Sequence, residues 1–194
     1  QLLGAAFGSS GERCMALSVA VAVGDAAGDA LVSKMSAAMT ALKVGAYSDS
    51  HNDFGPVITK QHQEKIRGYI DQAEQQGASI VVDGRYPAVP GYEDGFYIGG
   101  TLIDGVTADM ESYKAEIFGP VLQVIRVATM QEAMDLIDAH EYGNGTCIFT
   151  RDGEAARYFS DNIQVGMVGI NIPLPVPVAY HSFGGWKRSL FGDL

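Results

Sequence analysis

The sequence has few cysteines and few basic residues, and each shortage argues against a class of protein. Two cysteines, Cys14 and Cys147, occur among 194 residues. This argues against a disulfide-stabilised secreted chain and favours two reduced thiols in a reducing compartment. Lysine and arginine total 13 against 23 aspartates and glutamates, for a net charge of -10. Such an acidic balance argues against non-specific binding to nucleic acid or to an anionic membrane.

Long apolar runs and a basic leader are also missing. No run reaches the roughly 18 apolar residues that a membrane-spanning helix needs. Residues 1–7 lack a basic region, so they do not resemble a secretory signal and are expected to be the end of a helix cut within the element. Hydrophobic residues make up 47% of the chain, which is enough for a folded core and too much for a disordered segment.

Strand-like and helix-like stretches alternate along the chain. Strands are predicted at 17–23, 79–82, 96–98, 101–103, 121–127, 145–150 and 165–172, and helices over 25–44, after Thr59 as far as Gly77, after Thr129 and after Asp152. The run at 121–127 is almost entirely apolar, which indicates a strand buried on both faces. The predicted fold class is therefore α/β, a mostly parallel twisted sheet with helices on both faces.

Residues 1–170 are predicted to form one domain. The stretch that follows contains Pro173, Pro175 and Pro177, and prolines remove hydrogen-bond donors that a central strand needs. Residues 171–194 are therefore predicted to be an extended segment rich in proline and glycine.

Residues 7–18 hold the most reactive candidate. Cys14 follows a turn rich in glycine and serine and comes directly after Arg13. A neighbouring cation favours the thiolate, which is the nucleophilic form, and glycines allow backbone N–H groups to face a ligand. A nucleophile beside such donors suits acyl chemistry, because a developing oxyanion must be stabilised. The alternative is a buried, unreactive cysteine.

Residues 113–121 form a second candidate. Glu116 stands just before the strongest predicted strand, at an edge where α/β folds bind ligands, and its carboxylate can accept hydrogen bonds from a ribose diol. Phe118 offers an aromatic face for a flat ring. The alternative is a solvated glutamate and a core phenylalanine.

Together these stretches resemble the catalytic domain of the NAD(P)-dependent aldehyde dehydrogenase superfamily. Five motifs occur in the family's order: Gly-Glu-Arg-Cys at 11–14, Phe-Gly-Pro-Val at 54–57, Glu-Ile-Phe-Gly-Pro-Val-Leu at 116–122, Tyr-Gly-Asn-Gly at 142–145 and Phe-Gly-Gly-Trp-Lys at 183–187. The sequences at 7–18 and 171–177 are most similar to the CoA-acylating methylmalonate-semialdehyde dehydrogenase branch.

The resemblance implies an enzyme that uses NAD and CoA to oxidise malonate or methylmalonate semialdehyde to acyl-CoA, in valine, pyrimidine and inositol breakdown. It implies that Cys14 is the nucleophile, forming a thiohemiacetal and then a thioester. It also implies that Arg13 binds the substrate carboxylate, that Glu116 binds the nicotinamide ribose, and that Phe118 packs beside the nicotinamide. A guanidinium does recognise carboxylate bidentately. The alternative for Arg13 is a structural ion pair with Glu12 or another acid.

The resemblance further implies that the NAD-binding domain is absent from this chain. Only the nicotinamide end of NAD is then expected to meet the chain, and the isolated chain is expected to be inactive. The expected partner is a small carboxylated aldehyde, with a homo-oligomer in the full-length parent and neither nucleic acid nor membrane. The expected location is the cytoplasm of a bacterium or the mitochondrial matrix of a eukaryote.

The remaining candidates are predicted to be structural. Cys147 is expected to be a core thiol in a buried strand, and His62 to lie in a polar surface position. No spacing indicates a metal site or a Cys–His dyad. Two other functions stay open: a non-catalytic α/β scaffold or interaction domain, and a free-standing thiol enzyme with a histidine or aspartate beside Cys14.

Overall fold

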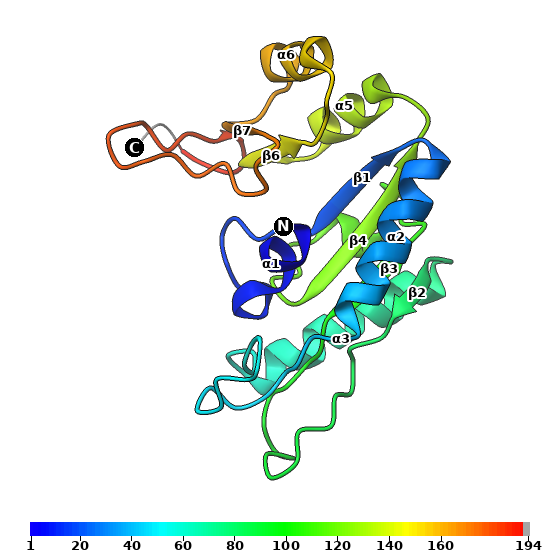
Figure 1. The fold of residues 1–194 in the computed structure, drawn as a ribbon, viewed down its shortest axis with the longest axis vertical. Helices are drawn as coiled ribbons and strands as arrows, with labels where there is room; N and C mark the ends of the chain where they lie inside the picture. The colour runs from blue at the N-terminus through cyan, green and yellow to red at the C-terminus, as the bar shows by residue number, and fades with distance from the viewer. Residues whose placement is uncertain (192–194) are drawn as a thin grey trace. The chain divides into compact units, whose positions relative to one another are not determined.

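The computed structural model describes residues 1–191 and divides the chain into two compact units, Gln1–Ala128 and Thr129–Leu194 (Figure 1). This division falls inside the range 1–170 that the sequence predicts as one domain, and the boundary at 170 stays a prediction. Among the described residues, no helix is both long enough and apolar enough to cross a bilayer.

The first unit is built on one four-stranded sheet. Its elements are α1 (Leu2–Phe7), η1 (Gly8–Gly11), β1 (Val19–Val23), α2 (Asp25–Met39), α3 (Lys60–Gln75), β2 (Ser79–Val82), β3 (Thr101–Asp104), α4 (Glu111–Lys114) and β4 (Val121–Val127). The strand order is β1-β4-β3-β2. Strands β1 and β3 run parallel to β4, and β2 runs antiparallel to β3. The predicted α/β class with a mostly parallel sheet is confirmed.

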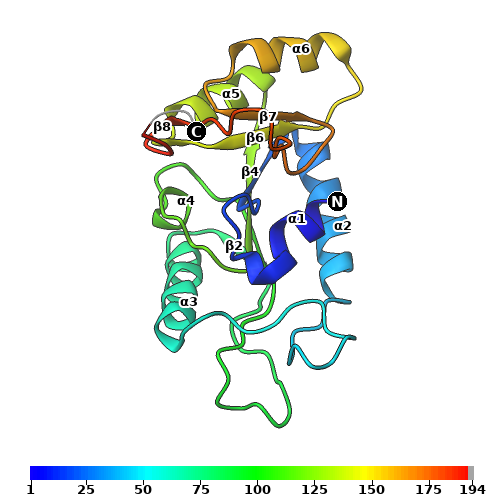
Figure 2. The same cartoon turned by 90° about the vertical axis from the view of Figure 1, so that its left-hand side faces the viewer.

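Helices cover both faces of this sheet, with α2 and α3 on opposite sides of it in Figure 2. Side chains alternate along β4, so Leu122 and Val124 face one way and Gln123 faces the other. Leu122 and Val124 pack in a core cluster with Phe7 of α1 and with side chains of α2. On the other face, Gln123 Nε2 donates to the carbonyl oxygen of Ser112 in α4 at 2.9 Å. Burial on both faces explains the unbroken apolar run of β4.

The predicted helix starts form as expected. The side chains of Thr59, Thr129 and Asp152 each accept a hydrogen bond from a backbone N–H two or three residues later. Such a cap contributes about 1 kcal/mol to helix stability. The helix predicted over 25–44 ends earlier than expected, since α2 stops at Met39. The brief strand predicted at 96–98 is wrong, because these residues belong to an irregular loop.

The second unit is smaller and contains two separate pairs of strands. Its elements are α5 (Met130–Ala139), β5 (Tyr142–Gly143), β6 (Gly145–Ile148), α6 (Gly153–Asn162), β7 (Met167–Ile170) and β8 (Trp186–Lys187). Strands β6 and β7 are parallel, and β5 and β8 are antiparallel. A core cluster of Met134, Phe159, Ile163 and Val165 joins the helices to the sheet. Residues 171–185 contain neither helix nor strand.

Candidate active site

Two neighbouring parallel strands bring the predicted site stretches together. Val19 of β1 lies opposite Gln123 of β4. Cys14 comes shortly before β1, and Glu116 and Phe118 come shortly before β4. Because the two strands are parallel, both stretches lie at the same end of the sheet, next to the amino ends of β1 and β4. Open α/β sheets bind ligands at the carboxyl ends of their strands, and the sequence prediction placed Glu116 at such a position. In the structure, Cys14, Glu116 and Phe118 instead lie at the amino ends of β1 and β4, so this part of the prediction is corrected.

The two stretches touch through a pair of glycines. Gly11 has a φ of 70°, and a Cβ atom there would lie 2.2 Å from the carbonyl oxygen of Gly119. Only glycine permits both the left-handed conformation and this close approach. Ser9 and Ser10 precede it with φ values of 55° and 58°. Three successive left-handed residues therefore make the tight turn of η1 that seats this stretch on the segment before β4.

Cys14 lies in the turn between η1 and β1. The residue is exposed, so the alternative of a buried core cysteine does not hold. The surrounding backbone is tied down, since Ala16 N–H donates to Arg13 O at 3.0 Å and Leu17 N–H donates to Ala5 O at 3.2 Å. Cys14 is thus an accessible thiol on an anchored turn.

The alternative role of Arg13, an ion pair with Glu12 or another acid, does not occur among residues 1–191. Its Nη2 donates to the carbonyl oxygens of Gly4 at 2.8 Å and Ala5 at 3.2 Å. These carbonyls belong to α1, where a cation complements the helix dipole. A Cβ atom on Gly8 would lie 2.9 Å from Nη2, so the guanidinium rests directly against that glycine.

Glu116 and Phe118 both face solvent. Ile117 between them is 2% exposed, whereas Phe118 is 38% exposed, so Phe118 is not a core side chain in this structure. Within the described part of the chain, the Glu116 carboxylate has no hydrogen-bond or ion-pair partner. A carboxylate and an aromatic ring are therefore both available to a ligand at this edge.

His62 contacts the candidate site, although sequence reasoning did not place it there. Its Nε2 lies 2.7 Å from the carbonyl oxygen of Phe118 and 3.6 Å from Oε1 of Glu12. The His62 side chain is 21% exposed and its nearest partners are polar, which agrees with the predicted polar surroundings and leaves the ring only partly at the surface. A signal was present: His62, Ile66 and Ile70 are spaced by four residues, which places the histidine on the buried face of α3.

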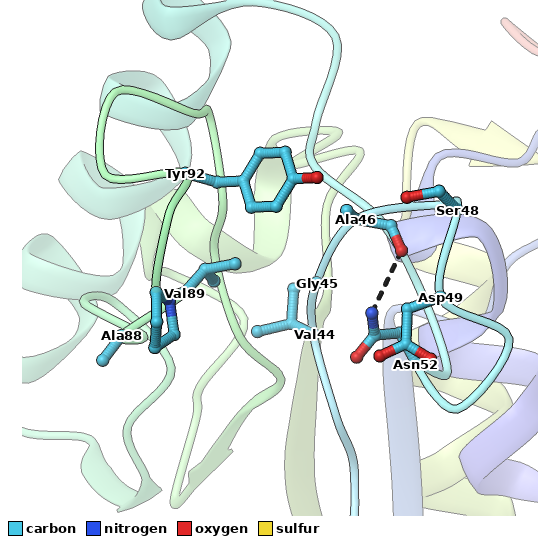
Figure 3. A pocket seen from close by; sticks show the side chains of 10 residues that line it. Val44, Gly45, Ala46, Ser48, Asp49, Asn52, Ala88, Val89 and Tyr92 are labelled. Atoms are coloured by element: carbon cyan, nitrogen blue, oxygen red, sulfur yellow. Dashed lines mark hydrogen bonds between the residues drawn. The ribbon is translucent and has the colours of Figure 1, made fainter.

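A pocket of about 230 Å³ lies elsewhere in the first unit (Figure 3). Its lining comes from residues 44–52 and 88–92, and Asn52 Nδ2 donates to Ala46 O at 3.0 Å on one wall. Hydrogen bonds from His51 lower the pKa of Asp49, which also lines it. None of the candidate site residues lines this pocket, so it is not the candidate active site.

The second thiol is in the other unit. Cys147 lies on β6, whose residues are half-buried rather than buried as predicted. Its Sγ is 3.8 Å from the carbonyl oxygen of Pro173, and burial raises the pKa of the Cys147 thiol. In the described part of the chain, no group of three or more histidine, cysteine, aspartate or glutamate side chains could hold a metal ion.

Sequence comparison identifies close relatives. Malonate-semialdehyde dehydrogenase of Pseudomonas aeruginosa is 64% identical over 193 residues, which cover 100% of this chain and 39% of that protein. The mitochondrial, acylating methylmalonate-semialdehyde dehydrogenase of Arabidopsis thaliana is 49% identical over 195 residues, covering 100% of this chain and 32% of that protein.

Structural comparison gives the same relationship. The crystal structure of methylmalonate-semialdehyde dehydrogenase from Oceanimonas doudoroffii matches with a TM-score of 0.98 and 85% identity, over 100% of this chain and 40% of that one. A putative methylmalonate-semialdehyde dehydrogenase from Sinorhizobium meliloti complexed with NAD matches with a TM-score of 0.97 and 55% identity, over 100% of this chain and 39% of that one. The chain spans at most 40% of the length of these relatives. The model of the aldehyde dehydrogenase family matches residues 1–194, and the chain belongs to that family.

Proposed function

We propose that this chain is the cysteine-bearing catalytic portion of an NAD-dependent dehydrogenase that oxidises malonate or methylmalonate semialdehyde to acyl-CoA. The names of the similar proteins support this substrate class. The word "acylating" in the name of the Arabidopsis relative supports a thioester product. A homo-oligomer, and a location in the cytoplasm or the mitochondrial matrix, stay predictions.

One observation carries the proposal. The turn that bears Cys14 and the segment that bears Glu116 and Phe118 lead into adjacent parallel strands and touch at Gly11 and Gly119. An accessible nucleophile and an accessible ribose-binding carboxylate are thereby held on one edge of a rigid sheet. Oxidation of an aldehyde by a cysteine enzyme requires the nucleophile and the hydride acceptor, which the carboxylate would bind, to lie near one substrate.

Cys14 performs the covalent chemistry. Its thiolate sulfur bonds to the aldehyde carbon, and the carbonyl oxygen becomes the alkoxide of a thiohemiacetal. Departure of a hydride from that carbon leaves an acyl thioester on Cys14. The thiolate of CoA then attacks the thioester carbon and the bond to the Cys14 sulfur breaks, so that acyl-CoA leaves and the Cys14 thiolate is restored. The exposure of Cys14 supports this role, because both the aldehyde and CoA must reach the sulfur.

The residues present fit the nicotinamide end of NAD. The exposed Glu116 carboxylate lacks a protein partner in the described part of the chain, so it can accept the hydroxyl hydrogens of a ribose. Phe118 presents an exposed ring next to it. When bound, NAD supplies the acceptor for the hydride.

Arg13 recognises the carboxylate of the substrate in this proposal. Its Nη2 is committed to the carbonyls of α1, which fixes the guanidinium in place without neutralising its charge. The Nη1 group makes no hydrogen bond within the described residues and is left for a carboxylate. A short substrate with an acid at one end and an aldehyde at the other suits adjacent Arg13 and Cys14.

The test compares the two thiols in the protein as its gene encodes it. Malonate semialdehyde, NAD and CoA are supplied, and NADH and acyl-CoA are both measured. Cys14→Ser is expected to lower the rate about a thousandfold or more, whereas Cys147→Ser is expected to keep it. Turnover that survives Cys14→Ser, or release of the free acid in the presence of CoA, contradicts the proposal.

A further inference from the structure

We infer that His62 is a positioning residue that holds the segment before β4, and with it Glu116 and Phe118, in the conformation that receives NAD. This inference rests on the function proposed above. It begins from the backbone of Phe118, which has a φ of 56°. The left-handed region is unfavourable for a bulky residue. Such a conformation persists only where neighbouring groups hold it.

His62 supplies one of these restraints. Its Nε2 is 2.7 Å from the carbonyl oxygen of Phe118. The carbonyl can only accept, so Nε2 carries the proton and donates it. Because the histidine sits in the first turn of α3, whose Thr59 cap binds the His62 N–H at 3.1 Å, the donor is itself fixed.

The same helix supplies a second restraint one turn later. A Cβ atom on Gly119 would lie 2.5 Å from Cδ1 of Ile66, and Ile66 is fully buried. Helix α3 therefore contacts Phe118 through His62 and Gly119 through Ile66. The strained residue and its successor are clamped against one rigid face.

Glu12 connects this clamp to the stretch that bears the cysteine. Its Oε1 lies 3.6 Å from His62 Nε2 and accepts a hydrogen bond from Ile58 N–H at 3.4 Å. The Glu12 side chain is only 10% exposed. His62 thus lies between the residue two positions before Cys14 and the carbonyl two positions after Glu116, so it relates both halves of the candidate site.

The consequence is specific to the cofactor side of the site. Without the bond from His62, the Phe118 peptide can relax out of the left-handed region, which moves the Phe118 ring and the nearby Glu116 carboxylate. The turn that bears Cys14 has its own anchors on α1, namely the hydrogen bonds from Leu17 N–H to Ala5 O and from Arg13 Nη2 to Gly4 O. Loss of His62 is therefore expected to weaken NAD binding and to leave the reactivity of the Cys14 thiol unchanged.

The first experiment measures amide hydrogen exchange in peptides that cover residues 115–121. His62→Leu removes the donor, whereas His62→Gln places an amide nitrogen near the position of Nε2. His51→Leu is the control, since among residues 1–191 His51 bonds only Asp49, and its side chain is 83% exposed. Exchange is expected to be faster in His62→Leu and close to wild type in the other two variants. Unchanged exchange in a folded His62→Leu protein overturns the inference.

The second experiment measures kinetics in the protein as its gene encodes it. The KM for NAD is expected to rise about tenfold in His62→Leu, equivalent to about 1.4 kcal/mol, and to recover in His62→Gln. The deuterium isotope effect on turnover, measured with an aldehyde deuterated at the carbonyl carbon, is expected to change in the His62→Leu variant together with the KM for NAD. Iodoacetamide should label Cys14 at the wild-type rate.

The outcomes separate the two proposals. If the KM for NAD is unchanged in His62→Leu although residues 115–121 exchange faster, His62 is only structural and the inference is overturned. If the KM changes and His62→Gln fails to restore it, the hydrogen bond is not the cause and the inference is again overturned. Failure of the proposed function is seen separately, as turnover that survives Cys14→Ser, and the exchange experiment does not depend on turnover.

Discussion

Strand β4 of the first unit and strand β6 of the second unit are buried to different depths. In the first unit, β4 is buried at five successive positions, from Val121 to Ile125. In the second unit, all four positions of β6 are only half-buried. The first unit joins its strands into one four-stranded sheet, whereas the second has two separate pairs.

The candidate site lies entirely in the unit that contains the deeply buried strand β4. Arg13, Cys14, His62, Glu116 and Phe118 all belong to the first unit. Left-handed backbone occurs there at Ser9, Ser10 and Phe118, and in the second unit at Asn171 and Lys187. Strain of this kind needs well-packed surroundings to persist. A catalytic group must be held precisely by its surroundings. In the first unit, the left-handed residues other than glycine lie in the same two stretches that carry the candidate site.

The largest expected effect tests burial directly. Leu122→Ala removes a fully buried side chain from β4 and is expected to lower the free energy of unfolding by about 3–5 kcal/mol. Ile148→Ala on half-buried β6 is expected to lower it by about 1–2 kcal/mol. Urea unfolding of both variants measures the difference, and equal losses would show that the two units are packed alike.

The next effect concerns substrate recognition in the first unit. Arg13→Leu is expected to reduce kcat/KM for a carboxylated semialdehyde by the equivalent of about 2–4 kcal/mol, the scale of losing a buried charge-assisted pair. Propionaldehyde lacks the carboxylate and should lose much less. Thermal unfolding records the separate cost of the lost bonds to α1. Equal kinetic losses on both aldehydes contradict a carboxylate-binding role.

A smaller effect isolates the contact between the two site stretches. Gly11 and Gly105 have similar φ values, 70° and 72°, but a Cβ atom would clash with Gly119 only at Gly11, and nothing lies within 4 Å at Gly105. Gly105→Ala is expected to cost about 1 kcal/mol for the left-handed conformation alone. Gly11→Ala should cost about 1–3 kcal/mol more and should reduce turnover. Equal stability of the two variants would show that the close approach is unimportant.

The smallest effect compares the thiols of the two units. Iodoacetamide at neutral pH is expected to label exposed Cys14 well before half-buried Cys147, and peptide mapping after brief labelling gives the order. Burial raises the pKa of Cys147, so its thiolate fraction is low at neutral pH and labelling of Cys147 should accelerate as the pH rises. If Cys147 reacts first in the folded protein, Cys14 has no physical basis as the nucleophile.

Local signals in the sequence predicted most of the elements. The caps at Thr59, Thr129 and Asp152 were predictable because each uses a side chain and a backbone N–H a few residues apart. The strand at β4 was predictable because burial on both faces requires an apolar run. Cys14, Glu116 and Phe118 were identified as candidates for a similar reason, since each stands in a short motif whose residue types already indicate a chemistry.

Contacts between distant segments were not predictable in this way. The antiparallel orientation of β2 and the position of the site at the amino ends of β1 and β4 depend on strand pairing, which no short motif encodes. The bonds from Arg13 to the α1 carbonyls were also not predictable, because the guanidinium can reach several acceptors and only the folded chain brings these carbonyls to it. His62 was overlooked because its importance comes from the carbonyl of Phe118, which lies far along the chain.

Residue order alone was enough to establish the α/β class, the family and the residue types available for chemistry, because these depend on local patterns and motifs. Folding decided which edge of the sheet holds them, why Gly11 must be glycine, and that His62 contacts the segment carrying Glu116 and Phe118. The physical reason is that close approach, strain and hydrogen-bond geometry exist only between segments already packed together. A sequence pattern identifies the reactive side chains, and the packing of α3 and β4 determines the distances between them.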